Sequence, residues 1–433
     1  MGAFSARAIL APGIGFAAAV GLANGAMAAG FALKEQGAAG LGNAFAGATA
    51  AGQGDLSTIF FNPAGMTTLS GSQVEVVTSY IMPKAEFSAT RAVRATATPI
   101  SGGNGGDGAE DALLPAFYAM YDMAPDLKLG IGINAPWGLV TEYDSDWVGR
   151  YHALKSDLQT INISPSVAWR VNDRISLGGG LQIQRADAEL TNAIDFGLVM
   201  APGVLDGAFD GVGKLEGDDW GYGFTLGAMF DLRKSTRIGV TYRSQVQHTL
   251  EGDASFSGVP GPLAGVFTNT KASAKLITPD TVSAGLYHQI NPQWAVLADV
   301  TWTNWSKFKE LRVDFQNNLP DSVTPENWDD ATFVSLGATY RPSEQMTLRA
   351  GVAFDQSPVP DQFRTPRIPD EDRLWLAMGV GYKVTPAISL DASYTHIFVN
   401  DGTLNLASAN AGTIVGTYDN AVDILTAQLR WVF

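Results

Sequence analysis

The segment AGFALKEQGAAGLGNAFAGATAAGQGDLSTIFFNPAGMTTL, residues 29–69, divides this chain into two parts of different character. It is rich in glycine and alanine, carries few charges, includes Asn62-Pro63-Ala64-Gly65 near its end, and shows no sustained alternation. From residue 71 to Phe433 the sequence alternates between apolar and polar residues, which is typical of β-strands with two different faces. We therefore predict that residues 29–70 form a plug, or hatch, and that residues 71–433 form a barrel around it.

The first 28 residues have the features of a secretory signal peptide. Arg7 provides a positive charge, residues 9–20 are apolar, and Ala26-Met27-Ala28 is a small-residue cleavage site. The mature chain is then expected to begin at Ala29. A short buried helix is the alternative, and Pro12 disfavours it.

Composition limits the classes of function that the chain could have. A formal net charge of -15 argues against a nucleic-acid partner, because phosphate binding requires basic patches. The chain has no cysteine, so it has neither disulfides nor thiolate metal sites, which suits an outer-membrane protein. Its four histidines are scattered, and no G-x-S-x-G or H-E-x-x-H motif is present, so we expect neither an enzyme nor a cofactor.

Alternation predicts an all-β fold of fourteen antiparallel strands, and single-chain bacterial barrels nearly always have an even number. The predicted strands cover residues 72–82, 112–122, 126–136, 157–171, 174–190, 219–232, 235–250, 272–290, 292–306, 331–341, 344–356, 372–384, 386–399 and 421–433. Six tight turns alternate with seven long loops along the chain. This is typical of a Gram-negative outer-membrane barrel with short periplasmic turns, long extracellular loops and both termini in the periplasm. A soluble β-sandwich, the alternative, would have connections of similar length at both ends.

The end of the chain resembles the C-terminal signal read by the outer-membrane assembly machinery. Phe433 is the last residue, and apolar or aromatic residues precede it at every second position. We expect a monomer surrounded by outer-membrane lipid, with the assembly machinery as a transient partner.

Charged residues on the predicted inward faces line the lumen. They are Glu75, Asp299, Arg349, Asp391 and Arg430. We expect these charges to pair across strands and to hold the hatch, although a cation could also meet a substrate carboxylate.

Two predicted loops, residues 191–218 and 251–271, are unusually apolar. Their candidate ligand-binding residues are Phe196, Leu198, Met200, Leu205, Phe256, Leu263 and Phe267. Exposed apolar surface often marks a binding site, so these loops could capture a hydrophobic ligand or simply pack together to close the barrel.

The third predicted strand is interrupted at Asn134-Ala135-Pro136-Trp137-Gly138. Proline cannot donate a hydrogen bond to a β-ladder and glycine often marks a bend, so pairing must stop there. The sequence is equally compatible with a strand end and with an opening in the barrel wall.

These features together resemble the FadL family of outer-membrane transporters for long-chain fatty acids and hydrocarbons. The resemblance covers the mature chain and rests on motifs that occur in order: Ala29-Gly30-Phe31, Gly40-Leu41-Gly42-Asn43-Ala44, Asn62-Pro63-Ala64-Gly65, Pro292-Gln293-Trp294-Ala295, Asp355-Gln356-Ser357-Pro358-Val359-Pro360 and Ile368-Pro369-Asp370-Glu371-Asp372-Arg373.

The resemblance implies a fourteen-stranded barrel closed by an N-terminal hatch. It further implies that ligand is captured between extracellular loops, passes to a tighter pocket near Phe31, and leaves sideways through the kink at Asn134, Pro136, Trp137 and Gly138. Passive uptake of long-chain fatty acids is therefore the expected function. Uptake of alkanes or aromatic hydrocarbons, a general porin and a barrel lipase are the alternatives.

Overall fold

The computed structural model describes residues 29–200 and 207–433. The predicted signal peptide, residues 1–28, and Leu205 lie outside these described residues. None of the described helices is both long and apolar enough to cross a membrane.

The chain forms a closed antiparallel β-barrel whose wall has fourteen strands, as predicted. Its strand segments are β1 (Gln73–Val93), β2 (Ala112–Ala124), β3 (Leu127–Asn134), β4 (Gly138–Glu142), β5 (Lys155–Asn172), β6 (Ile175–Asp195), β7 (Asp210–Arg233), β8 (Thr236–Arg243), β9 (Val246–Ser257), β10 (Thr270–Thr278), β11 (Thr281–Gln289), β12 (Trp294–Thr303), β13 (Glu310–Phe315), β14 (Ser322–Pro325), β15 (Ala331–Tyr340), β16 (Met346–Asp355), β17 (Arg373–Lys383), β18 (Ile388–Val399), β19 (Gly402–Ser408) and β20 (Gly412–Val432). The helices are short: α1 (Ala38–Leu41), α2 (Thr58–Phe61), η1 (Pro63–Thr68), α3 (Phe196–Met200), η2 (Gly261–Leu263), η3 (Trp305–Lys307) and η4 (Asp361–Phe363). The ladder between β1 and β20 closes the barrel.

Several wall strands extend further than predicted on the side of the long connections. β7, for example, begins at Asp210 rather than near residue 219, so much of the predicted 191–218 loop belongs to a hydrogen-bonded ribbon. This part carries polar residues on its outer face, as expected for strands that project into water, and therefore lacks the alternation that marks a lipid-facing strand. The strands predicted over residues 235–250 and 272–290 are each broken in two, at 244–245 and 279–280.

Alternate side chains separate an apolar exterior from a packed interior. On β12, Trp294, Val296 and Val300 are exposed, whereas Leu297 and Asp299 between them are buried. Exposed aromatic residues gather near the short turns, as an interfacial girdle requires; they include Tyr121, Trp169, Trp294, Tyr382 and Trp431.

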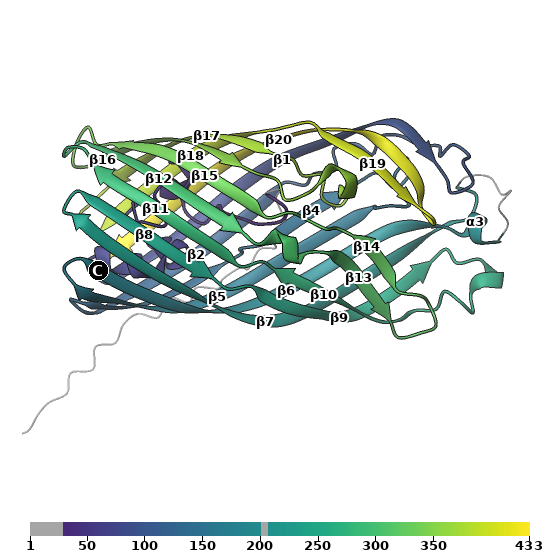
Figure 1. Ribbon diagram of the computed structural model, residues 1–433, viewed down its shortest axis with the longest axis horizontal. Coiled ribbons are helices and arrows are strands. Elements are labelled where there is room, and N and C mark those ends of the chain that lie inside the picture. Colours follow the sequence, from purple (N-terminus) through teal and green to yellow (C-terminus); the bar gives the residue numbers. More distant parts are fainter. Residues whose placement is uncertain (1–28, 201–206) are drawn as a thin grey trace, which may run out of the picture.

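Most of residues 29–69 are buried, and they hydrogen-bond to strands of the wall. Figure 1 shows this N-terminal segment, in purple, in the half that carries the short turns and the C-terminus. Glycines in the wall allow its backbone to approach the strands closely: a Cβ atom at Gly239 would lie 1.9 Å from the Thr49 carbonyl oxygen, and one at Gly351 would lie 2.2 Å from Asn43. Within the segment, a Cβ at Gly65 would lie 1.8 Å from Thr58 Oγ1. The high glycine content therefore serves the packing of this segment as well as its turns.

Candidate functional site

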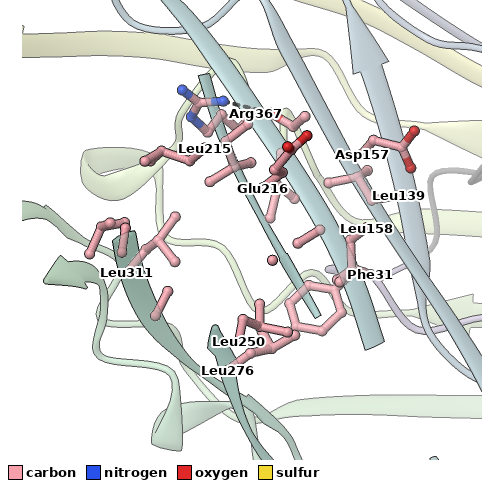
Figure 2. A pocket seen from close by; sticks show the side chains of 18 of the residues that line it. Phe31, Leu139, Asp157, Leu158, Leu215, Glu216, Leu250, Leu276, Leu311 and Arg367 are labelled. Carbon is pink, nitrogen blue, oxygen red and sulfur yellow. Dashed lines mark hydrogen bonds between the residues drawn. The ribbon is translucent and has the colours of Figure 1, made fainter. Parts of the chain in front are cut away.

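An apolar cavity of about 110 Å³ lies in the half of the barrel with the long connections; we call it the outer cavity. Strands β5, β6, β7, β9, β10 and β13 supply most of its wall. The N-terminal segment, β4, the residues that flank β13 and β14, and the connection between β16 and β17 supply the rest. Leucines dominate the lining, namely Leu139, Leu158, Leu190, Leu215, Leu250, Leu276 and Leu311. Figure 2 shows Phe31 and Arg367 well apart, with the apolar side chains between and around them.

Arg367 is the main polar feature of the outer cavity. Its Nη1 donates hydrogen bonds to the Lys155 carbonyl oxygen at 3.0 Å and to Ser156 Oγ at 2.8 Å, and Nη2 donates to the Thr191 carbonyl oxygen at 3.3 Å. These neutral acceptors orient the guanidinium without cancelling its charge, and no described carboxylate forms an ion pair with it. Burial lowers the pKa of Arg367 to about 10, an effect opposed by the charge of Glu326, so Arg367 remains a cation at neutral pH.

Glu326 lines the same cavity and is almost fully buried. Its Oε2 accepts a hydrogen bond of 2.9 Å from Trp328 Nε1. Burial raises the pKa of Glu326 to about 8, although the Trp328 hydrogen bond and the Arg367 charge both favour the ionised form. At neutral pH this carboxyl is therefore mostly neutral. The lining also includes Asp157 and Glu216, whose carboxylates lie 3.6 Å from Lys155 Nζ and 2.8 Å from Lys214 Nζ rather than against Arg367.

Phe31 closes the outer cavity on the side of the N-terminal segment. Its ring is buried and meets a layer of aromatic side chains. The ring centroids lie 4.7 Å from Trp305, 5.8 Å from Trp328, 5.9 Å from Trp137 and 6.0 Å from Phe308. We call Phe31, Trp137, Trp305, Phe308 and Trp328 the aromatic layer.

The start of the N-terminal segment is fastened to the connection between β16 and β17. The Gly30 amide donates to Asp370 Oδ2 at 2.8 Å, and Asp370 also accepts from Ser357 Oγ at 2.8 Å and pairs with Arg373. Gly30 has a φ of +63°, and a Cβ there would lie 2.6 Å from Trp328, so only glycine suits this position. Sequence reasoning singled out the motif around Asp370 but did not identify this role.

The interruption in the third wall strand is a real break between β3 and β4, at residues 135–137. On the β5 side, the Trp137 amide donates to Thr160 Oγ1 at 3.0 Å and the Trp137 carbonyl oxygen accepts from it at 2.6 Å, and other backbone groups at the break pair with the N-terminal segment. The Leu33 amide donates to the Pro136 carbonyl oxygen at 2.8 Å, and the Gly138 amide donates to the Phe31 carbonyl oxygen at 2.9 Å. Asn134 is buried at the end of β3. The Phe31 backbone and the strand break are thus hydrogen-bonded to each other.

The same break interrupts the wall on the β2 side. The β2–β3 ladder ends at the pair Phe117–Ile133, and beyond it the structure describes only the single bridge between Ala109 and Thr141. The first residues of β2 therefore have main-chain partners on β1 but no ladder to β4.

Asn62 forms a buried turn within the N-terminal segment. Its Oδ1 accepts from the Ala64 amide at 3.1 Å, and its Nδ2 donates to the carbonyl oxygens of Thr49 at 2.7 Å and of Ala228 on β7 at 3.2 Å. Pro63 then begins η1, where its missing N–H costs nothing. One side chain thereby holds the turn, the segment and the wall together.

All five predicted lumen charges have described partners: three contact the N-terminal segment, and the other two form an ion pair with each other. Glu75 Oε2 accepts from the Leu56 amide at 3.1 Å, Asp299 accepts from the Thr49 amide and hydroxyl at 2.9 Å each, Arg430 donates to the Gly54 carbonyl oxygen, and Arg349 pairs with Asp391 at 2.7 Å. Three of them therefore tie the segment to the wall, and none lines the outer cavity.

The apolar loop residues form a cluster of their own. The Phe267 ring lies 4.9 Å from Phe196 and 5.5 Å from Phe256. Phe256 belongs to β9 rather than to a loop, because the strand runs on to Ser257. Leu198, Met200 and Leu263 are half-buried nearby in the sequence. None of these residues lines the outer cavity, whose leucines sit on strands and carried no distinguishing signal in the sequence.

Three of the four histidines make separate side-chain hydrogen bonds, and His248 Nε2 bonds Gln184 Nε2 at 3.0 Å. His288 Nδ1 bonds Thr236 Oγ1 at 2.9 Å, and His396 Nδ1 bonds Asp423 Oδ1 at 2.8 Å. Within residues 29–200 and 207–433, no group of three or more His, Asp or Glu side chains could hold a metal ion.

Comparison with known proteins identifies the family. Residues 19–433 match the family described as "Outer membrane protein transport protein (OMPP1/FadL/TodX)". The chain is 33% identical to a candidate outer membrane protein of Neisseria meningitidis serogroup B, covering 90% of this chain and 91% of that protein. It is 31% identical to the long-chain fatty acid transport protein of Escherichia coli O6:H1, covering 86% and 87%. The crystal structure of a Pseudomonas aeruginosa FadL homologue superposes with a TM-score of 0.86 at 26% identity, covering 94% of this chain and all of that one. The chain therefore belongs to the OMPP1/FadL/TodX family of outer-membrane transport proteins.

Proposed function

We propose that this protein carries long-chain fatty acids, or hydrophobic molecules of similar form, passively across the outer membrane. One observation carries the proposal: an apolar cavity contains a cation without an ion-pair partner, and Phe31, which closes it, is hydrogen-bonded to a break in the wall. The name of the Escherichia coli relative supports the choice of substrate.

Binding in the outer cavity requires no energy source. Each buried CH₂ contributes about 0.8 kcal/mol, so the leucine lining stabilises an acyl chain strongly. Arg367 has five N–H donors, of which hydrogen bonds to neutral groups use only some, and it can donate the others to a carboxylate. The Phe196, Phe256 and Phe267 cluster, at the end of the barrel with the long connections, would make the first contact with the ligand.

Release then proceeds sideways through the break between β3 and β4. When Phe31 withdraws, the hydrogen bonds from Leu33 and Gly138 break, and the stretch of wall without a ladder loses its inner support. An acyl chain that leaves there enters the membrane and never returns to water. This lateral route explains why the hatch and the wall defect are linked in one structure.

A reversible crosslink tests the route. Ala32 and Trp137 are partners in an antiparallel bridge, so the double variant A32C/W137C can form a disulfide that locks the hatch to the break. The chain has no native cysteine, so no other disulfide can form. We expect uptake of radiolabelled oleate by cells to stop under oxidising conditions and to recover on reduction.

The matched control is the pair E86C/D107C, which replaces another isolated bridge away from the hatch. It should crosslink without affecting uptake, and each single variant should be insensitive to oxidant. Undiminished uptake by the crosslinked A32C/W137C protein would rule out the lateral route.

Uptake of uncharged hydrocarbons is the alternative within the family. Arg367 favours the acid, since a hydrocarbon offers its guanidinium no partner. Replacing Arg367 by methionine should reduce oleate uptake about tenfold or more and leave uptake of a long-chain alkane unchanged. Equal effects on both substrates would favour the hydrocarbon.

A further inference from the structure

A second cavity, of about 90 Å³, lies inside the barrel and has no role in the route described so far; we call it the inner cavity. Two short segments, residues 31–34 and 136–139, contribute lining residues to both cavities. Phe31 lines the outer cavity and residues 32–34 line the inner one, while Leu139 lines the outer cavity and Pro136 and Trp137 line the inner one. The aromatic layer therefore lies between them, and the inner cavity reaches the break in the wall.

The lining of the inner cavity is divided into two chemically different walls. The N-terminal segment and the break contribute an apolar wall that includes Leu33, Phe61 and Trp137. Strands β8, β11 and β12 contribute hydroxyl groups, among them Ser283 and Thr301. A cavity of this kind suits a molecule that has a hydrocarbon chain and a polar head.

Two cations line the inner cavity, and among the described residues only Arg243 has hydrogen-bond acceptors. Arg243 donates to Gln182 Oε1 at 3.2 Å and to the Phe60 carbonyl oxygen at 2.7 Å. Lys34 Nζ lies 3.8 Å from the centroid of the Phe333 ring, but no hydrogen bond or ion pair joins it to any described residue.

The carboxylate that lines the inner cavity, Asp299, does not bind Lys34. Asp299 lines the same cavity, but it accepts two hydrogen bonds from Thr49 and forms no ion pair with Lys34. Burial lowers the pKa of Lys34, although the carboxylates of Asp355, Glu35 and Asp299 oppose the shift. An arriving anion would stabilise the charged ammonium further and would supply the hydrogen-bond acceptor that it lacks.

We propose that the inner cavity is a second binding station for a single-chain carboxylate, whose head group Lys34 Nζ binds after the ligand passes the aromatic layer. The inference rests on the proposed function and adds a site to it. The head group would move from Arg367 to Lys34 while the acyl chain remains in apolar surroundings, and the ligand would then lie beside Pro136 and Trp137. This arrangement avoids leaving a carboxylate without a cation in the middle of the barrel.

The test compares an acid with its uncharged analogue in the full-length protein. Lys34→Met keeps the length of the side chain and removes its charge. We expect uptake of palmitate by cells to fall about tenfold or more, and uptake of hexadecanol, which has the same chain and no charge, to stay within about twofold. Lys34→Arg should restore palmitate uptake, and Lys383→Met, which changes an exposed lysine on β17, should leave both substrates unaffected.

Folding of each variant is checked by its heat-dependent migration on a gel. If palmitate uptake by folded Lys34→Met equals that of the wild type, or if uptake of both substrates falls equally, the inner station is overturned. If the wild-type protein takes up neither substrate, the proposed function itself fails, so the two failures can be told apart. Loss of palmitate uptake alone, with rescue by Lys34→Arg, supports the station.

Discussion

Different side chains of the outer cavity would bind the acyl chain and the carboxylate of a fatty acid. The leucines contribute apolar area, whereas Arg367 contributes a charge that only neutral groups contact. Glu326 adds a second titratable group whose charge state changes close to physiological pH. The net charge of the outer cavity therefore changes with pH through Glu326, even though Arg367 stays protonated.

Binding of a carboxylate should weaken as the pH rises through the Glu326 pKa of about 8. Below that pH Glu326 is neutral; above it, its negative charge competes with the ligand for Arg367, while the ligand itself stays ionised throughout. We expect laurate affinity to fall about tenfold between pH 6.5 and pH 9, measured by competition in detergent. Glu326→Gln should remove this dependence, and Glu310→Gln, at an exposed position on β13, should retain it. A flat profile in the wild type would contradict the prediction.

Among the elements, the N-terminal segment packs closely against glycines of the wall. A Cβ at Gly351 would meet Asn43 backbone atoms at 2.2 Å, whereas one at Gly179 would meet nothing nearer than 3.6 Å. Backbone atoms cannot move aside as a flexible side chain can, so the segment itself must shift.

Gly351→Ala should therefore loosen the segment and destabilise the protein by about 1–3 kcal/mol. The expected result is a lower midpoint of thermal unfolding together with new ion-conducting steps in planar bilayers. Gly179→Ala is the matched control and should behave like the wild type. Unchanged conductance and stability in Gly351→Ala would show that the segment is not seated by this contact.

Phe433, which we propose the assembly machinery recognises, directly follows β20. Phe433 is exposed, and its amide donates to the Ser72 carbonyl oxygen at 2.9 Å, so its side chain contributes little to the folded barrel. Phe433→Ala should reduce the amount of protein in outer-membrane fractions without changing the unfolding temperature of the protein that does assemble. Normal amounts would argue against recognition of this residue.

The whole molecule is a barrel whose lumen is filled by its own N-terminus. Asn62, Ala64 and Ala50 in that segment are fully buried, and the two cavities on either side of the aromatic layer are small. A general porin needs a continuous aqueous channel, which fourteen strands with a plug do not leave open. The arrangement suits molecules that move through apolar contacts.

Intact protein should accordingly be electrically silent in planar bilayers, and mass spectrometry should find single-chain carboxylates among the ligands that copurify with it. Steady ion conductance from the intact protein would favour the porin alternative. Copurified hydrocarbons without acids would instead favour the other substrate class of the family.

The number of strands, the alternation of short turns with long loops, and the family could all be predicted from the sequence. The reason is that lipid on one side and the lumen on the other impose a two-residue period that can be read locally. The wall break was also visible, because Pro136 cannot pair in a ladder. Its partner was not, since nothing local connects Gly138 with Phe31, more than a hundred residues away.

Which residues form the cavities, and which charges among the described residues lack an ion-pair partner, follows from contacts between distant segments. Arg367 and Lys34 resemble other cations in the sequence, and they become distinctive only because neighbouring strands bring no carboxylate into contact with them. Conversely, Arg349 and Asp391 look equally available in the sequence, yet the ladders of β16 and β18 with the intervening β17 bring them to 2.7 Å, across Gly381. Pairing and enclosure depend on contacts between distant segments, and a local pattern does not contain them.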